Sequence, residues 1–126
     1  MISFAAFAIE PGSPIYLQLI DFIKRGIVSG RIRQEDVMPS RRVLSALLGV
    51  NPNTVQKAYR LLEEESLIVS QTGAKSHVCV DGDVVARLRA ELLARDAGSL
   101  VRAMKETGLS KAEALRLVDD LWEGKE

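Results

Sequence analysis

The feature that most constrains the fold is a pair of short amphipathic segments joined by about three residues around Gly49. The first follows Ser40 and has apolar residues at helical spacing: Val43, Leu44, Leu47 and Leu48. The second opens with Asn51 and Pro52, which suit the N-cap and the first helical position. Its apolar face reads Val55, Ala58, Tyr59 and Leu62. Two short helices around a glycine predict a helix-turn-helix.

The segments on either side extend this motif. Apolar residues recur at helical spacing from Pro14 to Gly30, with Ser13 as the expected N-cap, and residues 2–9 suit a short strand or an ordered arm. Residues 67–70 and 76–80 are β-prone and flank a polar turn, which predicts a hairpin and so a winged helix. Asp83 is the expected cap of a long helix that stops at Gly108, and Ser110 opens a last helix.

The predicted fold is mostly α with a small β hairpin. We expect a winged helix-turn-helix DNA-binding domain over residues 1–80, followed by a two-helix dimerisation arm over residues 81–126. The 17 basic residues balance the 17 acidic ones, which excludes a uniformly basic nucleic-acid coat. Basic residues nevertheless gather around the helix-turn-helix, with seven between Lys24 and Lys57 against two acidic ones, where phosphate contacts would be needed.

Several other classes of protein fit poorly. One cysteine and one histidine, Cys79 and His77, cannot form a disulfide or a tetrahedral zinc site within one chain, and both are expected to be structural. No set of residues suits an enzyme or a cofactor, and the run Glu63 to Glu65 is expected to be solvated. No apolar run is long enough for a membrane helix, and the chain start lacks the basic residues of a signal peptide. We therefore expect a cytoplasmic protein.

The stretches PIYLQLIDFIKRGIVSGRI and MPSRRVLSALLGVNPNTVQKAYRLLEEESLIV closely resemble the N-terminal domain of the GntR family of bacterial transcription regulators, over roughly residues 14–80. The short tail, with GLSKAE between its two helices, is similar to the YtrA subfamily, in which two such helices form the dimer interface. Three positions depart from the family pattern. Gln34 and Glu35 replace a Pro-Gly turn, Ser66 replaces the glycine after the recognition helix, and Lys75 replaces the second wing glycine.

The resemblance implies DNA contacts from the start of the first helix of the motif, from the start of the recognition helix and from the wing. The candidates are Arg41, Arg42, Asn51, Asn53, Thr54, Gln56, Lys57, Thr72, Gly73 and Lys75. Gln56 suits adenine readout because its amide donates and accepts at once, and Lys57 suits a phosphate. Each has a plainer alternative: Asn51 as a helix cap, the others as solvated surface or an ordinary turn.

The last two helices have two interpretations, as a satellite of the winged helix or as a dimer arm. We favour the arm, with the apolar stripe Leu88, Leu92, Leu100, Met104, Leu115, Leu121 and Trp122 as the interface. The predicted function is a homodimeric regulator, a repressor, that binds a palindromic double-stranded DNA operator. The alternative is a winged helix used only for protein–protein contact. Whether a small-molecule effector exists is left open, and no cofactor, metal or membrane partner is expected.

Overall fold

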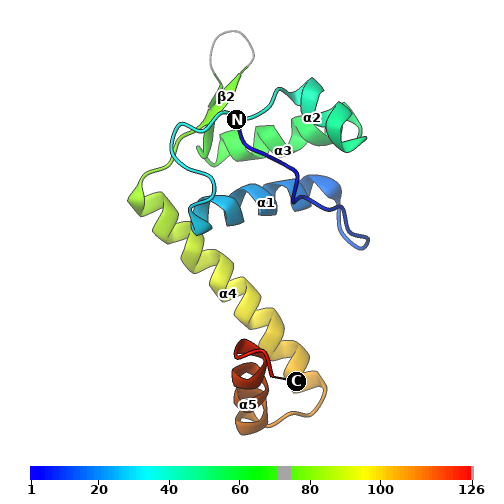
Figure 1. Ribbon diagram of the computed structural model, residues 1–126, viewed down its shortest axis with the longest axis vertical. Helices are drawn as coiled ribbons and strands as arrows, with labels where there is room; N and C mark the ends of the chain where they lie inside the picture. Colours follow the sequence, from blue (N-terminus) through cyan, green and yellow to red (C-terminus); the bar gives the residue numbers. More distant parts are fainter. Residues whose placement is uncertain (71–74, 126) are drawn as a thin grey trace. The chain divides into compact units, whose positions relative to one another are not determined.

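The computed structural model describes residues 1–70 and 75–125 and divides into two compact units, Met1–Arg89 and Ala90–Glu126. The first unit contains helices, a hairpin and the first turns of the long helix that follows the hairpin (Figure 1). In chain order the elements are α1 (Ile15–Ser29), α2 (Arg41–Leu48), α3 (Pro52–Glu64), β1 (Ile68–Ser70), β2 (Ser76–Val78), α4 (Gly82–Glu106) and α5 (Lys111–Trp122). This confirms the predicted fold class, a mostly helical winged helix-turn-helix.

The helix-turn-helix is bounded by side-chain caps. Ser40 Oγ accepts a hydrogen bond from the backbone N–H of Val43 at 3.2 Å, and Asn51 Oδ1 accepts one from the N–H of Asn53 at 2.8 Å. Gly49 takes a left-handed conformation (φ 68°) between the two helices, which a residue with a Cβ adopts only at a cost. The turn therefore forms where the sequence places it.

Two predicted caps are wrong. Helix α1 begins at Ile15 with Pro14 at the N-cap position, so Ser13 does not cap it; the Ser13 carbonyl instead accepts a hydrogen bond from Gln18 Nε2 at 3.0 Å. At the start of α4, Asp81 Oδ1, not Asp83, accepts from the backbone N–H of Val84 at 2.9 Å. Helix α1 thus has no side-chain cap, whereas α4 is capped by the residue two positions before the predicted one.

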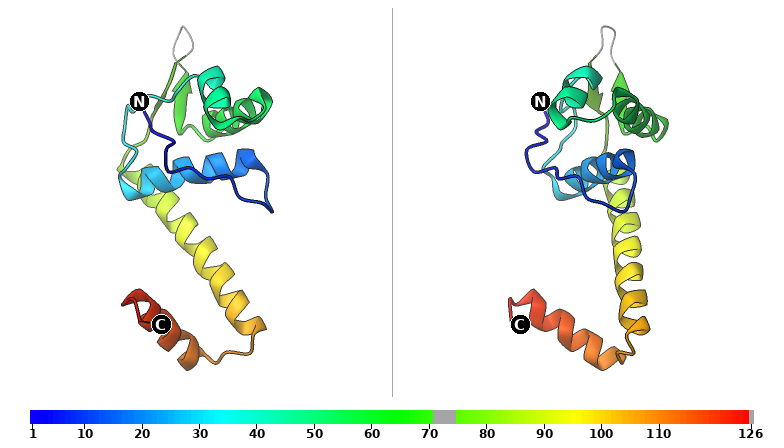
Figure 2. Two further views of the ribbon diagram at one scale, coloured as in Figure 1. Left: turned by 45° about the vertical axis from the view of Figure 1, so that its right-hand side comes forward. Right: turned by 90° about the vertical axis from the view of Figure 1, so that its right-hand side faces the viewer.

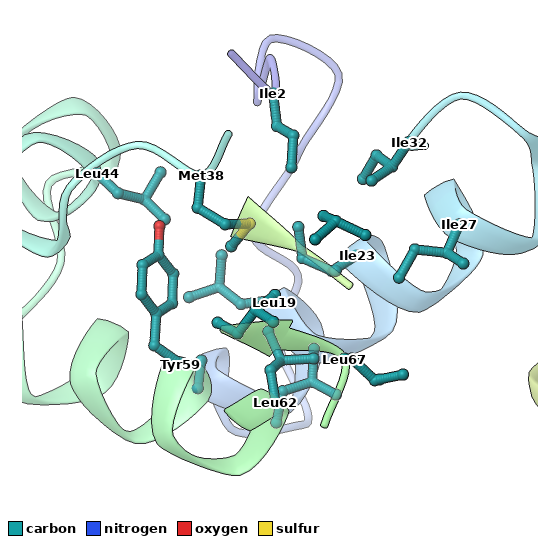
Figure 3. Close-up of a cluster of buried hydrophobic side chains, with 14 of the residues drawn as sticks. Ile2, Leu19, Ile23, Ile27, Ile32, Met38, Leu44, Tyr59, Leu62 and Leu67 are labelled. Carbon is teal, nitrogen blue, oxygen red and sulfur yellow. The ribbon is translucent and has the colours of Figure 1, made fainter. Parts of the chain in front are cut away.

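The core of the first unit collects side chains from every one of its segments (Figure 3). Ile2 comes from the N-terminal arm, Leu19 and Ile23 from α1, Met38 from the loop before α2, and Leu62 from α3. The arm is ordered without strand pairing, and the backbone N–H of Ile2 donates to the Val37 carbonyl at 2.9 Å. The first turns of α4 join this core through Leu88, which is 1% exposed.

The apolar face predicted for α2 is only half buried. Leu44 is fully buried, whereas Val43 and Leu47 are exposed. Helix α2 is eight residues long and packs chiefly against α3. A helix with one neighbour buries one narrow side, so a spacing that favours a wide apolar face overstates what is covered.

The hairpin pairs β1 with β2 in antiparallel register, with Ile68 opposite Val78 and Ser70 opposite Ser76. An isolated bridge between Val37 and His77 lies beside it. Two departures from the family pattern lie at left-handed positions: Glu35 has φ 70° and Ser66 has φ 61°. The backbone conformation that the family's glycines favour is therefore kept here by residues with side chains, at some cost in strain.

The second unit holds most of α4 together with α5. The chain turns between α4 and α5 (Figure 2), with Gly108 in the left-handed conformation. Ser110 and Glu113 form the predicted capping box at the start of α5. No residue of α5 is buried. An amphipathic helix whose apolar side stays exposed is short of a partner within its own chain.

Candidate nucleic-acid interface

The recognition helix α3 exposes a polar start and buries an apolar remainder. Its buried residues are Val55, Ala58, Tyr59 and Leu62, as predicted. Asn53 and Gln56 are exposed, and Thr54 is half-buried. Asn51 acts as the cap, so its side-chain oxygen already accepts one hydrogen bond. Backbone N–H groups at a helix start attract phosphate, which makes this end of α3 suited to DNA.

Arg42 lies in the first turn of α2 with its side chain exposed. Within residues 1–70 and 75–125, the Arg42 side chain forms no hydrogen bond, ion pair or ring contact. Its guanidinium is therefore available for a phosphate or for the edge of a guanine, which a two-pronged donor matches. Tyr59 ties this end of α2 to the middle of α3, because its hydroxyl donates to the Pro39 carbonyl at 2.6 Å.

Arg41, the neighbouring candidate, is half-buried and paired within the protein. Its Nη2 lies 2.8 Å from Glu63 Oε1, and its guanidinium carbon lies 5.0 Å from the centre of the Tyr59 ring. Its Nε is buried and has no partner among the described residues. The expectation of a solvated glutamate run is accordingly wrong for Glu63, which is half-buried and bonded, and Glu65 pairs with Lys24 at 2.9 Å.

Tyr59 itself stays protonated at ordinary pH. Burial raises the pKa of its hydroxyl well above the usual value, and the nearby charge of Arg41 lowers it by less. The protonated hydroxyl is what can donate to Pro39. The start of α2 is thus fixed on α3 by a neutral hydrogen bond.

Lys57 projects from the same helix toward α1. Its ammonium nitrogen lies 4.1 Å from the centre of the Tyr16 ring, a cation–π contact, while the residue as a whole remains exposed. The contact restrains the side chain without removing its charge from solvent. Sequence reasoning missed this pair, although both residues lie in predicted helices.

The wing is described only in part. Thr72 and Gly73, both predicted to contact DNA, lie outside the described residues. Lys75 is exposed and directly precedes β2. His77 lies in β2 opposite Val69, and its Nδ1 is buried without a partner in the described part of the chain. Cys79 is a free, exposed thiol one residue beyond β2.

The residues predicted for the dimer interface fall into two groups. Leu88 belongs to the core of the first unit, so its burial needs no second chain. Leu92 is also buried, at 6% exposure. Of the others, Met104 is half-buried and four are exposed: Leu100, Leu115, Leu121 and Trp122. The exposed group lies wholly in the second unit.

Other chemistry finds little support in the part of the chain that the structure describes. Its His, Cys, Asp and Glu residues form no group that could hold a metal ion. No helix there is both long and apolar enough to cross a membrane. Fold and site together define a winged-helix DNA-binding protein.

Comparison with known proteins leads to the same class. Residues 15–78 match the family described as "Bacterial regulatory proteins, gntR family". The chain is 30% identical over 115 residues to the transcriptional regulator YhcF of Bacillus subtilis, covering 91% of this chain and 95% of YhcF. It is 39% identical over 72 residues to the repressor YtrA of the same organism, covering 56% of this chain and 55% of YtrA. A GntR-family regulator from Listeria monocytogenes has a similar structure, with a TM-score of 0.79 at 28% identity over 89% of this chain and 98% of that one.

The protein belongs to the GntR family of DNA-binding transcriptional regulators, and it is not an enzyme. The matches to YhcF and YtrA confirm the expected likeness to the YtrA subfamily.

Proposed function

We propose that this regulator is a homodimeric repressor that binds an inverted-repeat operator through two copies of α3. One observation carries the proposal: two packed helices of one motif both expose polar donors, the start of α3 and, in the first turn of α2, the Arg42 guanidinium, which is unpaired within the described chain. A free guanidinium and a helix start lined with amides are the donors that duplex DNA accepts in its major groove.

The proposed contacts divide by chemistry. Gln56 reads a base edge, because its exposed amide can donate to and accept from adenine together. Arg42 contacts a phosphate or a guanine, and Asn53 and Thr54 contact groups at the helix start. Lys57 and Lys75 contribute charge toward phosphates. Arg41 is removed from this set because its guanidinium is paired with Glu63.

The dimer is supported by the apolar surface of the second unit. Leu100, Leu115, Leu121 and Trp122 are 48% to 84% exposed, and α5 buries no residue. Exposed apolar residues in such density mark an interface more often than a free surface. A second copy of the same chain is the simplest partner, because an operator with twofold symmetry needs two recognition helices.

The repressor role is supported by likeness to YtrA and by what occupancy of an operator does. YtrA is described as a repressor, and a protein that occupies an operator blocks access without further machinery. A protein–protein module is the alternative. It fits less well because the exposed start of α3 is polar, whereas a protein-binding face would offer apolar anchors.

The test is selection of sequences from a pool of random DNA duplexes, followed by binding titrations over a range of salt concentrations. We expect an inverted repeat and an affinity that falls steeply with salt, because phosphate contacts release counterions. If no common sequence is recovered, and DNA binding is weak and independent of salt concentration, the protein–protein alternative is favoured.

A further inference from the structure

A chain of polar contacts connects both helices of the motif to Ser70 and Ser76, the strand pair at the turn end of the hairpin. Glu63 Oε1, near the end of α3, accepts from Arg41 Nη2 at 2.8 Å and from Ser70 Oγ at 2.7 Å. Ser70 Oγ lies 3.3 Å from Ser76 Oγ on the paired strand. The backbone carbonyl of Ser76 in turn accepts from the N–H of Met38, just before α2, at 2.8 Å.

The surroundings of these groups make the contacts stronger than an ordinary surface pair. The Arg41 and Glu63 side chains are 29% and 33% exposed, and Ser76 is buried at 3%. The pair on the neighbouring helix face, Arg60 with Glu64, has the same 2.8 Å separation but is 52% and 57% exposed. Because solvent screens the exposed pair more, only the Arg41–Glu63 pair is expected to restrain the backbone.

We propose that Arg41 and Glu63 are positioning residues for DNA binding: they fix the turn end of the paired strands β1 and β2, and the start of α2, on the recognition helix. In this role Arg41 does not touch DNA. Its guanidinium is paired with Glu63, and its neighbour Arg42 contacts the duplex. Arg41 thus helps to orient the hairpin relative to α3, and Arg42 binds the DNA. This inference rests on the proposed operator binding.

A positioning role and charge alone predict opposite changes in DNA affinity for the Glu63→Ala variant. Glu63→Ala removes a negative charge beside a DNA-binding surface, which by charge alone should tighten binding. If Glu63 acts by positioning, the variant should instead bind about five- to tenfold more weakly, the range typical of coupled contacts. Glu64→Ala is the matched control, since it removes the same charge from the next residue of α3 and frees only Arg60.

The DNA experiment uses the full chain and a duplex recovered by selection with the unmodified protein. We expect Arg41→Gln and Glu63→Ala to weaken binding by similar factors, and the double variant to be no weaker than the weaker single variant. The dependence of log affinity on log salt should keep its slope in Arg41→Gln, whereas Arg42→Gln should flatten it by about one unit. Tighter binding by Glu63→Ala, or a flattened slope for Arg41→Gln, would overturn the proposal.

A second measurement needs no DNA and separates this inference from the proposed function. Amide hydrogen exchange in the free protein should be faster in β1 and β2 of Glu63→Ala than of Glu64→Ala, because the turn end of the paired strands has lost its anchor on α3. Equal exchange in the two variants would show that the hairpin is held without Glu63. If selection yields no operator, the operator proposal is lost, and the exchange result still decides whether this anchor exists.

Discussion

Arg41 and Arg42 are adjacent in the sequence, and the structure gives them opposite surroundings. The first is half-buried between Glu63 and the Tyr59 ring, and the second is exposed. Helical spacing turns neighbouring side chains by about 100°, so one faces α3 when the other faces away. At this scale the chemistry of the site depends on which of the two arginines pairs with the half-buried Glu63 carboxylate.

Gln56 and Lys57 should contribute to DNA binding in separable ways. Gln56→Ala should cost about 1–3 kcal/mol on the selected operator and relax preference at one base pair, because it removes a base contact. Lys57→Ala should weaken binding to all sequences and flatten the salt slope by about one unit, as loss of a phosphate contact does. Titrations on operator and scrambled duplexes measure both, and an equal loss on both duplexes for Gln56→Ala would reassign it to the backbone contacts.

Tyr59 should make stability depend on alkaline pH. Its folded-state pKa lies above the ordinary value of 10.0, so above pH 10 the unfolded chain loses the tyrosine proton while the folded chain keeps it. The unfolded state then binds fewer protons, and the free energy of unfolding falls by about 1.4 kcal/mol per pH unit from this group.

Tyr59→Phe isolates that effect. Near neutral pH the variant should be less stable by about 1–3 kcal/mol, because the buried Pro39 carbonyl loses its donor. Above pH 10 the difference from the unmodified protein should shrink, as measured by denaturant unfolding at several pH values. A difference that stays constant to pH 11 would show that Tyr59 titrates normally.

At the scale of elements, patterns of spacing and capping predicted most of the fold, and neighbours decided the remainder. The helix-turn-helix, the hairpin and the capping box at Ser110 are local features, which is why sequence indicates them. The exposure of Val43 and Leu47 was unpredictable because it depends on how few elements cover α2. The Arg41–Glu63–Ser70 contacts join three elements, and no local pattern marks them.

Two glycines inside helices should respond oppositely to alanine. A Cβ on Gly26 of α1 would collide with the Ile32 side chain, so Gly26→Ala should destabilise by about 1–3 kcal/mol through overpacking. A Cβ on Gly98 of α4 would meet only the end of the Arg102 side chain, at 3.4 Å. Gly98→Ala should therefore stabilise by about 0.5–1 kcal/mol, the usual helix preference.

Thermal unfolding of the two glycine variants provides the comparison. A Gly26→Ala variant that is more stable than the unmodified protein would mean that the Ile32 side chain can move aside at little cost, so that the close contact between Gly26 and Ile32 does not require glycine.

At the scale of the whole molecule, sequence placed the domain boundary at residue 80, whereas the compact units meet at residues 89 and 90. The boundary shifts because Leu88 packs into the core of the first unit. The helical spacing of apolar residues in α4 does not show which of them pack into that core. The same packing takes Leu88 out of the candidate interface and leaves the exposed apolar residues of the second unit. The proposed dimer therefore depends on that unit.

Charge placed in that surface should separate the chains. Leu121→Glu, at a position 57% exposed, should yield particles of 13.8 kDa by light scattering where the unmodified protein gives twice that mass. Leu17→Glu is the matched control, since Leu17 is also an exposed helical leucine but lies in the first unit. If the Leu121→Glu variant remains dimeric, the dimer interface does not depend on this surface.

The central claim is that two recognition helices related by a twofold axis read one operator. A mobility-shift series with the selected inverted repeat and added base pairs between its half-sites tests it most directly. Half-sites about one turn apart, roughly 10 bp, place both helices on one face of the duplex. Inserting about five base pairs should cause a large but incomplete loss of affinity, because one half-site and non-specific phosphate contacts remain. Affinity that is unchanged by the insertion would contradict the account and indicate binding by independent monomers.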